Sequence, residues 1–248
     1  MNSDIVMKTE HLTILREEHS SCTKCPKLCE TRDKIVFGAG TPSPDILVIA
    51  EAPGVTENTR GFPLIGDSGR VLDYLLSVSS EDERLHKLAK SFSFSRGGFG
   101  KNMYIWPDHE KAKTILCENI FYTNVIMCWP GKGNRDPETS EIENCKERLL
   151  KTIYITDPKL IISVGAFAAK TIMNKRSFSI MKERGRINDS IIMGTYTQIK
   201  YPIMPILHPS YLMRNPDFET DSGIWANTKN DIKKAYKVIK ELKRCWSI

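Results

Sequence analysis

The sequence predicts an α/β protein formed by a single domain over residues 1–248, with a central parallel four-stranded sheet and helices on both faces. Four short apolar runs alternate with stretches of helical periodicity, and this alternation is typical of parallel sheets. Polar or glycine-rich segments bound each run, as expected for a buried strand. A chain of 248 residues is long enough to bury a sizeable core. The predicted strands are 46–50, 120–126, 160–165 and 202–207.

Helices are predicted where apolar residues recur at intervals of three and four. In the helix over 66–79, Val71, Leu72 and Leu75 fall on one face. The helix over 138–154 has acidic residues near its start, where they complement the helix dipole. Residues 80–118 interleave aromatic and basic side chains, and we expect a loop-rich insertion there. The other predicted helices are 5–19, 166–173 and 226–242.

The composition narrows the classes of protein to consider. The net charge of +6 suits a polyanionic partner because Lys and Arg displace counterions from phosphates, although it is equally compatible with an ordinary basic protein. No apolar run approaches the roughly 18–20 residues of a membrane helix. The first fifteen residues lack the apolar segment of a signal peptide. We therefore expect a cytoplasmic protein that binds no membrane.

Polar clusters stand where three of the four predicted strands end. Glu51 and Glu57 follow the first strand, Asn124 lies in the second, and His208 follows the fourth. In doubly wound sheets, ligands bind outside the carboxyl ends of the strands. The three clusters are therefore expected to form one site.

The motifs around these clusters occur together in a known family. The chain contains AEAPGVTE at 50–57, GFPLIGDSG at 61–69, TNVIMC at 123–128, GNRDP at 133–137 and HPS at 208–210. From Cys22 to about Asn215 it resembles the family-four, iron–sulfur-containing uracil-DNA glycosylases. The resemblance implies a monomeric DNA-repair enzyme that flips a pyrimidine, uracil as first choice, out of DNA. Hydrolysis of the N-glycosidic bond would then leave an abasic site.

The resemblance also explains four of the seven cysteines, which a reducing compartment would not join in disulfides. It implies a [4Fe–4S] cluster that staples the N-terminal segment to the rest of the fold. A zinc ion or metal-free core thiols are the alternatives, and Cys29 is an alternative ligand near the first pair. The predicted ligands are Cys22, Cys25, Cys128 and Cys145.

Side-chain chemistry and the resemblance together suggest the catalytic roles. The amide of Asn124 can pair with the Watson–Crick edge of a flipped base. His208 can stabilise the anion that develops on the departing base. Glu51 and Glu57 can stabilise the sugar cation or orient water, but either could instead fix the motif loop through backbone N–H groups.

Further residues are expected to contact the base or the DNA backbone. Other glycosylase families have an aspartate where Ala52 stands, so this chain cannot use a carboxylate there as a general base. The N–H groups at the start of the 66–79 helix suit a phosphate. The resemblance implies that the loop after His208 enters the minor groove, where Arg214 or Leu212 would fill the vacated space or contact phosphates; a solvated loop is the alternative. The remaining candidates are Ala52, Pro53, Gly54 and Leu64 for the base, and Gly66, Ser68, Gly69 and Ser210 for DNA.

Leu64 is the clearest departure from the family, which has a phenylalanine there that stacks on uracil. Such a stack is worth roughly 1–3 kcal/mol. Either Phe62 replaces it, or the pocket accepts a bulkier pyrimidine, such as a hypermodified cytosine of phage DNA. A non-catalytic iron–sulfur DNA-binding module is a third hypothesis, but it would not need Glu51, Asn124 or His208.

Overall fold

The computed structural model describes residues 3–96, 102–131, 133, 135–193, 198–215 and 222–245. Its main sheet has six strands in the order β1-β5-β2-β6-β8-β7, and β3 and β4 form a separate two-stranded hairpin. The strands are β1 (Ala39–Gly40), β2 (Ile46–Ala50), β3 (Ser93–Arg96), β4 (Asn102–Ile105), β5 (Ile120–Asn124), β6 (Leu160–Val164), β7 (Asn188–Met193) and β8 (Gln198–Ile206).

The four predicted strands form the parallel centre of this sheet. Ile46 of β2 pairs with Ile120 of β5 on one side and Leu160 of β6 on the other, and β6 pairs in parallel with β8. The predicted total of four strands is wrong, because β1 and β7 add antiparallel edges. Edge strands need no continuous apolar run: β1 has two residues, and β7 begins with Asn-Asp-Ser.

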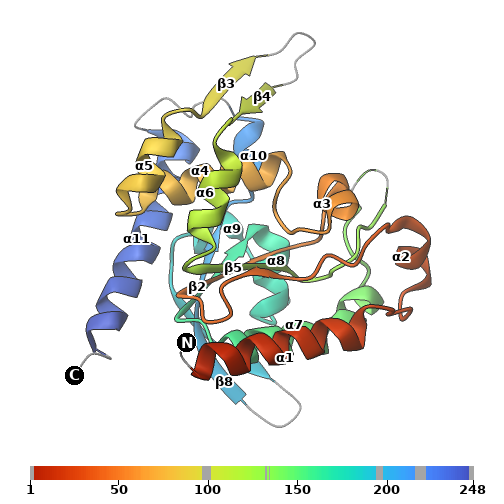
Figure 1. Ribbon diagram of the computed structural model, residues 1–248. Coiled ribbons are helices and arrows are strands. Elements are labelled where there is room, and N and C mark those ends of the chain that lie inside the picture. Colours follow the sequence, from red (N-terminus) through yellow and green to blue (C-terminus); the bar gives the residue numbers. More distant parts are fainter. Residues whose placement is uncertain are drawn as a thin grey trace.

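The predicted helices are confirmed, with ends that differ by a few residues, and shorter helices join them. Figure 1 shows α1 alongside α7 beneath the sheet and α11 at the left of the view. The helices are α1 (Ser3–His19), α2 (Pro26–Thr31), α3 (Val55–Arg60), α4 (Asp67–Ser79), α5 (Glu83–Ala89), α6 (His109–Leu116), α7 (Thr139–Thr156), α8 (Gly165–Ile172), α9 (Ile180–Glu183), α10 (Pro209–Met213) and α11 (Gly223–Cys245).

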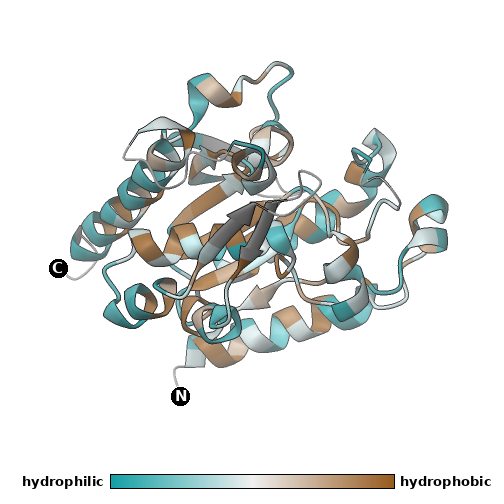
Figure 2. Ribbon diagram, turned by 90° about the horizontal axis from the view of Figure 1, so that it is seen from above, coloured by the Kyte–Doolittle hydropathy of each residue, from teal (hydrophilic) through white to brown (hydrophobic). Residues whose placement is uncertain are grey.

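Two apolar cores lie on the two faces of the sheet, because successive strand residues point to opposite sides. Val48 and Tyr122 belong to the core shared with α4, α5, α6, α10 and α11. Leu47 and Phe121 belong to the core shared with α2, α7 and α8, and α1 packs on its outside. The hydrophobic colour in Figure 2 is concentrated in the interior, and the hydrophilic colour on the outer helices. No helix among the described residues is long and apolar enough to cross a membrane.

Residues 80–118, predicted to be loop-rich, are more regular than expected. They contain α5, β3, β4 and α6, and the hairpin projects from the top of the molecule in Figure 1. Trp106 anchors this region: it is buried, and its indole N–H donates to the carbonyl of Leu88 at 2.9 Å. Part of the aromatic, basic stretch, residues 97–101, lies outside the described residues.

Candidate functional site

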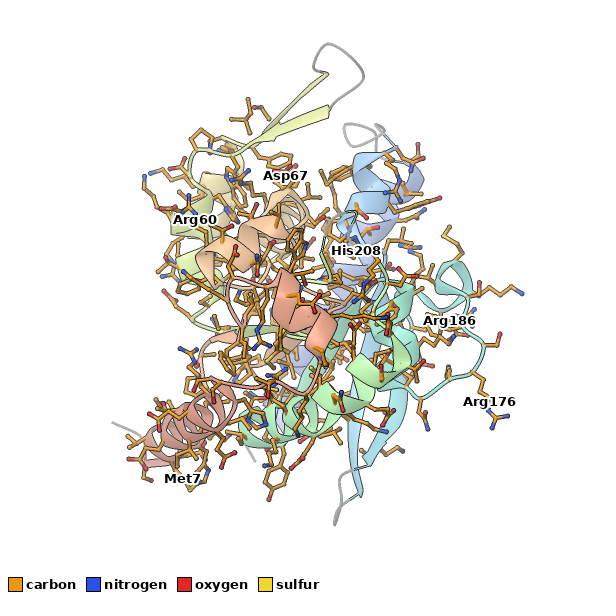
Figure 3. The ribbon with its side chains drawn as sticks, turned by 90° about the vertical axis from the view of Figure 1, so that its right-hand side faces the viewer. Met7, Arg60, Asp67, Arg176, Arg186 and His208 are labelled. Atoms are coloured by element: carbon orange, nitrogen blue, oxygen red, sulfur yellow. The ribbon has the colours of Figure 1, made fainter. Side chains whose placement is uncertain are left out.

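The predicted site residues gather at the carboxyl edge of the parallel strands. Asn124, the last residue of β5, pairs in register with Ala50 at the end of β2. After β2 the chain forms β5 on one side of it, and it then crosses over to form β6 on the other side. β2 therefore lies at the topological switch point, where such folds bind ligands. His208 follows β8, two strands beyond β2. Figure 3 shows His208 below α10, in the same upper part of the view as Asp67 at the start of α4.

Asn124 has an unsatisfied side chain. The residue is 1% exposed, and neither Oδ1 nor Nδ2 has a hydrogen-bond partner among the described residues. A buried amide without partners costs roughly 1–3 kcal/mol, so such a group in a native fold calls for an explanation. Its side chain belongs to the sheet face of Ile120 and Tyr122, because it stands four and two residues from them in the strand. The amide is free for a ligand with both a donor and an acceptor.

His208 is held as a neutral imidazole with a defined tautomer. Its Nδ1 accepts a hydrogen bond from the backbone N–H of Ser210 at 3.1 Å, and lies 2.7 Å from the Ser210 hydroxyl. A backbone N–H only donates, so Nδ1 carries no proton and Nε2 does. Burial, with a smaller effect of the Arg214 charge, lowers the pKa of His208 to about 4. The ring is therefore neutral at physiological pH and offers Nε2–H as a donor.

The two carboxylates of the first motif are in opposite situations. Burial, aided by the negative charge of Asp136, raises the pKa of Glu51 to about 7. In contrast, Glu57 accepts hydrogen bonds from the backbone N–H groups of Gly54 at 3.1 Å, Ile65 at 2.9 Å and Gly66 at 2.7 Å. A carboxyl with a pKa near 7 suits proton transfer, whereas Glu57 ties the two motif loops together.

Leu64 has an unusual backbone conformation. Its φ of 54° lies in the left-handed region that non-glycine residues rarely adopt, and its side chain is 6% exposed. Phe62 is 59% exposed and lines a cavity of about 930 Å³ with Ile105 and Trp106. Neither Asn124 nor His208 lines that cavity. The other predicted base contacts, Ala52, Pro53 and Gly54, follow β2 directly.

The structure gives several predicted DNA contacts a different role. The N–H of Gly66 is engaged by Glu57, so it is not free for a phosphate. A Cβ at Gly69 would stand 2.1 Å from the carbonyl oxygen of Leu64, so glycine there permits close packing of the loop on α4. Ser68, between them in the chain, is partly exposed and stays a candidate for a phosphate.

The loop after His208 also differs from the expectation. Ser210 holds the imidazole of His208. Leu212 is fully buried in the core, so the idea that it fills the space left by a flipped base is wrong. Arg214 is exposed at the end of α10 and remains available to DNA.

Sequence reasoning missed two residues of the site. Gly165 has a φ of 86°, and a Cβ there would stand 3.1 Å from Cβ of His208, so this glycine makes room for the imidazole. The available signal was a glycine directly after a buried strand. Asp136 raises the pKa of Glu51; its signal was its place in the GNRDP motif, whose Asn134 lies outside the described residues.

Four cysteines from distant parts of the chain share one region. The pKa of Cys25 is raised by burial and, to a lesser degree, by Cys145 and Cys22. Burial likewise raises the pKa of Cys128, with Cys145 contributing. Among the described residues no three Cys, His, Asp or Glu side chains converge closely enough to hold a single metal ion. Cys29 instead points its thiol at the carbonyl of Cys22, 3.9 Å away.

These features define a doubly wound α/β protein with a polar ligand site at its strand ends and a group of thiols beside the sheet. The family model described as the uracil DNA glycosylase superfamily matches residues 37–240, and the chain belongs to this superfamily. The resemblance drawn from the motifs is thereby confirmed.

Individual relatives agree with this assignment. The chain is 28% identical over 236 residues to the type-4 uracil-DNA glycosylase of Sulfurisphaera tokodaii, covering 94% of this chain and 85% of that protein. It is 29% identical over 234 residues to the type-4 uracil-DNA glycosylase of Thermotoga maritima, covering 94% and 97%. The corresponding enzyme of Saccharolobus solfataricus is 29% identical over 210 residues, covering 84% and 79%.

Proposed function

We propose that this protein is a monofunctional DNA glycosylase that hydrolyses the N-glycosidic bond of a flipped-out pyrimidine, with uracil as the first choice. Family membership and the names of the relatives support glycosylase activity on uracil. The observation that carries the proposal is the buried, unpartnered amide of Asn124. It matches the Watson–Crick edge of uracil, donating to O4 and accepting from N3–H.

The proposed chemistry starts with the C1′–N1 bond. As it breaks, its electron pair moves onto the pyrimidine, and negative charge develops at O2. The Nε2–H of neutral His208 is a donor suited to that oxygen, and a fixed donor in a dry site stabilises developing charge strongly. Water then attacks C1′ and loses one proton, which the ionised carboxylate of Glu51 or the departing base accepts. The products are the free base and an abasic site.

In this mechanism Glu57 is a positioning residue. Its hydrogen bonds to Gly54 and Gly66 fix the loop after β2 against the start of α4. This departs from the catalytic role expected of it, because its carboxylate already serves three backbone N–H groups.

We also propose a [4Fe–4S] cluster on Cys22, Cys25, Cys128 and Cys145. Four thiols are the donor set of such clusters. A tetrahedral zinc ion could use the same four thiols, so the iron content of the purified protein decides between the two. The mutual influence of Cys25, Cys128 and Cys145 on their pKa values supports a group that these thiols share. It would tie the N-terminal segment to α7 and to the end of β5.

The direct test is single-turnover excision from duplexes that carry uracil or modified pyrimidines, with abasic sites as the product. We expect wild type to excise uracil. We also expect the Asn124→Asp variant to differ from wild type in its base preference. Absence of abasic sites on every duplex, from protein with a full iron complement, would favour the non-catalytic DNA-binding module instead.

A second candidate is the same reaction on a bulky 5-substituted pyrimidine, such as a hypermodified cytosine. The small Leu64 side chain, in place of an aromatic ring, favours it because it gives up stacking and leaves space. The amide of Asn124 can serve cytosine too, with its donor and acceptor exchanged. Wild type should then prefer the bulky base, and Leu64→Phe should reverse the preference. Wild type that excises uracil efficiently and ignores every enlarged base contradicts this candidate.

A further inference from the structure

Two arginines lie beside the proposed cluster ligands. Nη2 of Arg148 donates to Sγ of Cys145 at 2.9 Å, and Nη1 of Arg32 donates to Sγ of Cys128 at 3.3 Å. Arg148 stands three residues after Cys145 in α7, a spacing that places both side chains on one helix face. Each of the two buried ligand thiols therefore has its own guanidinium.

Arg148 is buried more deeply than an unpaired cation should be. It is 2% exposed, and its Nε and Nη1 have no hydrogen-bond partner among the described residues. The ring of Phe37, with its centroid 5.8 Å from the guanidinium, supplies only a weak attraction. Burying a charge without a counter-charge costs several kcal/mol. The arrangement therefore calls for an anionic group beside Cys145 that accepts from the two free nitrogens.

Arg32 connects two of the cysteine segments. Besides its bond to Cys128, its Nη2 donates to the backbone carbonyl of Cys22. The residue follows α2 directly, so one guanidinium joins the N-terminal cysteine segment to the segment after β5. Cys25 has an uncharged donor beside it instead of an arginine, since Nδ2 of Asn144 lies 3.4 Å from Sγ of Cys25.

We propose that Arg32 and Arg148 are charge partners of the cluster, which donate to its thiolate and sulfide sulfurs and set its reduction potential and its retention. The inference rests on the proposed cluster. Four thiolates outweigh the positive charge of the iron–sulfur core, so the group is a buried anion. Net charge and hydrogen bonds to sulfur set the potential of such clusters. Cations and donors favour the reduced, more negative state, so both arginines raise the potential.

Arg16 provides a matched control. Its guanidinium lies over the same Phe37 ring, 5.6 Å from the centroid, and donates to the carbonyl of Gly38. It is exposed, and its described hydrogen bond goes to a carbonyl instead of a thiol. Arg16→Gln removes the same charge from the same neighbourhood without touching a proposed ligand.

The experiment compares anaerobically purified wild type with Arg32→Gln, Arg148→Gln, Arg148→Lys and Arg16→Gln. The midpoint potential is measured by following the iron–sulfur absorbance during reduction, and cluster retention by its bleaching rate in an iron chelator. Loss of a group behind a metal ligand typically weakens metal binding by about 10–100-fold. We expect Arg32→Gln and Arg148→Gln to bleach about tenfold faster or more and to shift to a lower potential, whereas Arg16→Gln should behave as wild type. Arg148→Lys, which keeps the charge, should lie between Arg148→Gln and wild type.

Distinct results overturn the inference. If Arg32→Gln and Arg148→Gln are brown and keep the wild-type potential and bleaching rate, the role of the arginines is overturned while the cluster proposal stands. The same holds if Arg16→Gln changes the potential and the bleaching rate as much as they do. Wild type without iron would overturn the cluster proposal and this inference with it. If Arg148→Gln fails to fold, Arg32→Gln and Arg148→Lys still decide the question.

Discussion

The strand-end site and the motif loop beside it differ in whether their buried polar groups have hydrogen-bond partners. In the loop, Glu57 accepts from three backbone N–H groups, so both oxygens of its carboxylate are hydrogen-bonded within the fold. In the site, the amide of Asn124 has no partner among the described residues, and Glu51 has a raised pKa. Satisfied groups stabilise the fold, whereas unsatisfied ones cost stability and are available to a ligand. The contrast separates positioning residues from residues that act on the substrate, even within one motif.

The largest expected effect is on catalysis. His208→Ala should slow single-turnover excision by about a hundredfold or more, because a fixed donor to the departing base is lost. The variant also loses the N-cap hydrogen bond from the backbone N–H of Ser210, so the free energy of unfolding should fall by about 0.5–2 kcal/mol. His11→Ala, at an exposed position of α1, is the control and should behave as wild type. An unchanged excision rate in His208→Ala would remove this residue from the mechanism.

The next effect is a loss of activity without a loss of stability when Asn124 is replaced. Asn124→Leu removes a buried, unpartnered amide, so the free energy of unfolding should stay equal or rise by about 1–2 kcal/mol. Excision should fall about tenfold or more, since a bidentate pair of hydrogen bonds to a base edge is worth about 1–3 kcal/mol by analogy with other base contacts. Denaturant unfolding and single-turnover assays measure the two quantities. A marked loss of stability would show that Asn124 has a structural partner after all.

Glu57 should give the reverse pattern. Glu57→Gln weakens charge-assisted hydrogen bonds to Gly54, Ile65 and Gly66, and should destabilise the fold by about 1.5–3 kcal/mol. Glu51→Gln, the matched variant in the same motif, should leave stability near neutral pH almost unchanged or improve it. Thermal unfolding of the two proteins at one pH makes the comparison. Equal destabilisation by both variants would contradict the distinction between the two carboxylates.

The smallest expected effect is a pH dependence. The raised pKa of Glu51 means that the folded state holds a proton that the unfolded state releases between pH 4.5, its ordinary value, and about 7. The contribution of Glu51 to stability therefore falls as pH rises through that window, while activity that needs the ionised carboxylate should rise through pH 7. His208 acts on stability in the opposite direction, because its pKa is lowered from 6.5 to about 4 and the unfolded state takes up that proton first as pH falls. Compared with wild type at each pH, Glu51→Gln should lose the fall in stability and the rise in activity, and an unchanged pH dependence of both in this variant would assign them to another group.

The central strands and the main helices follow from the sequence because their cause is local. Apolar runs such as 46–50 and the helical spacing in 66–79 are set by the residues themselves. The motif residues Asn124 and His208 could be named for the same reason, since Asn124 lies in a recognisable strand and His208 follows one. The edge strands could not, because β1 and β7 owe their pairing to a neighbour and carry no periodic signal of their own.

The sequence by itself determined the type of fold, the family and the set of polar and thiol groups that this protein has available. Only the tertiary structure decided which of them are satisfied. Glu51 and Glu57 cannot be told apart in the motif, yet one is desolvated near Asp136 and the other is bound by a loop eight residues away. Likewise, Arg148 is an ordinary helix residue until folding buries it against Cys145. The reason is that pKa values and hydrogen bonding depend on burial and on neighbours brought together from distant parts of the chain.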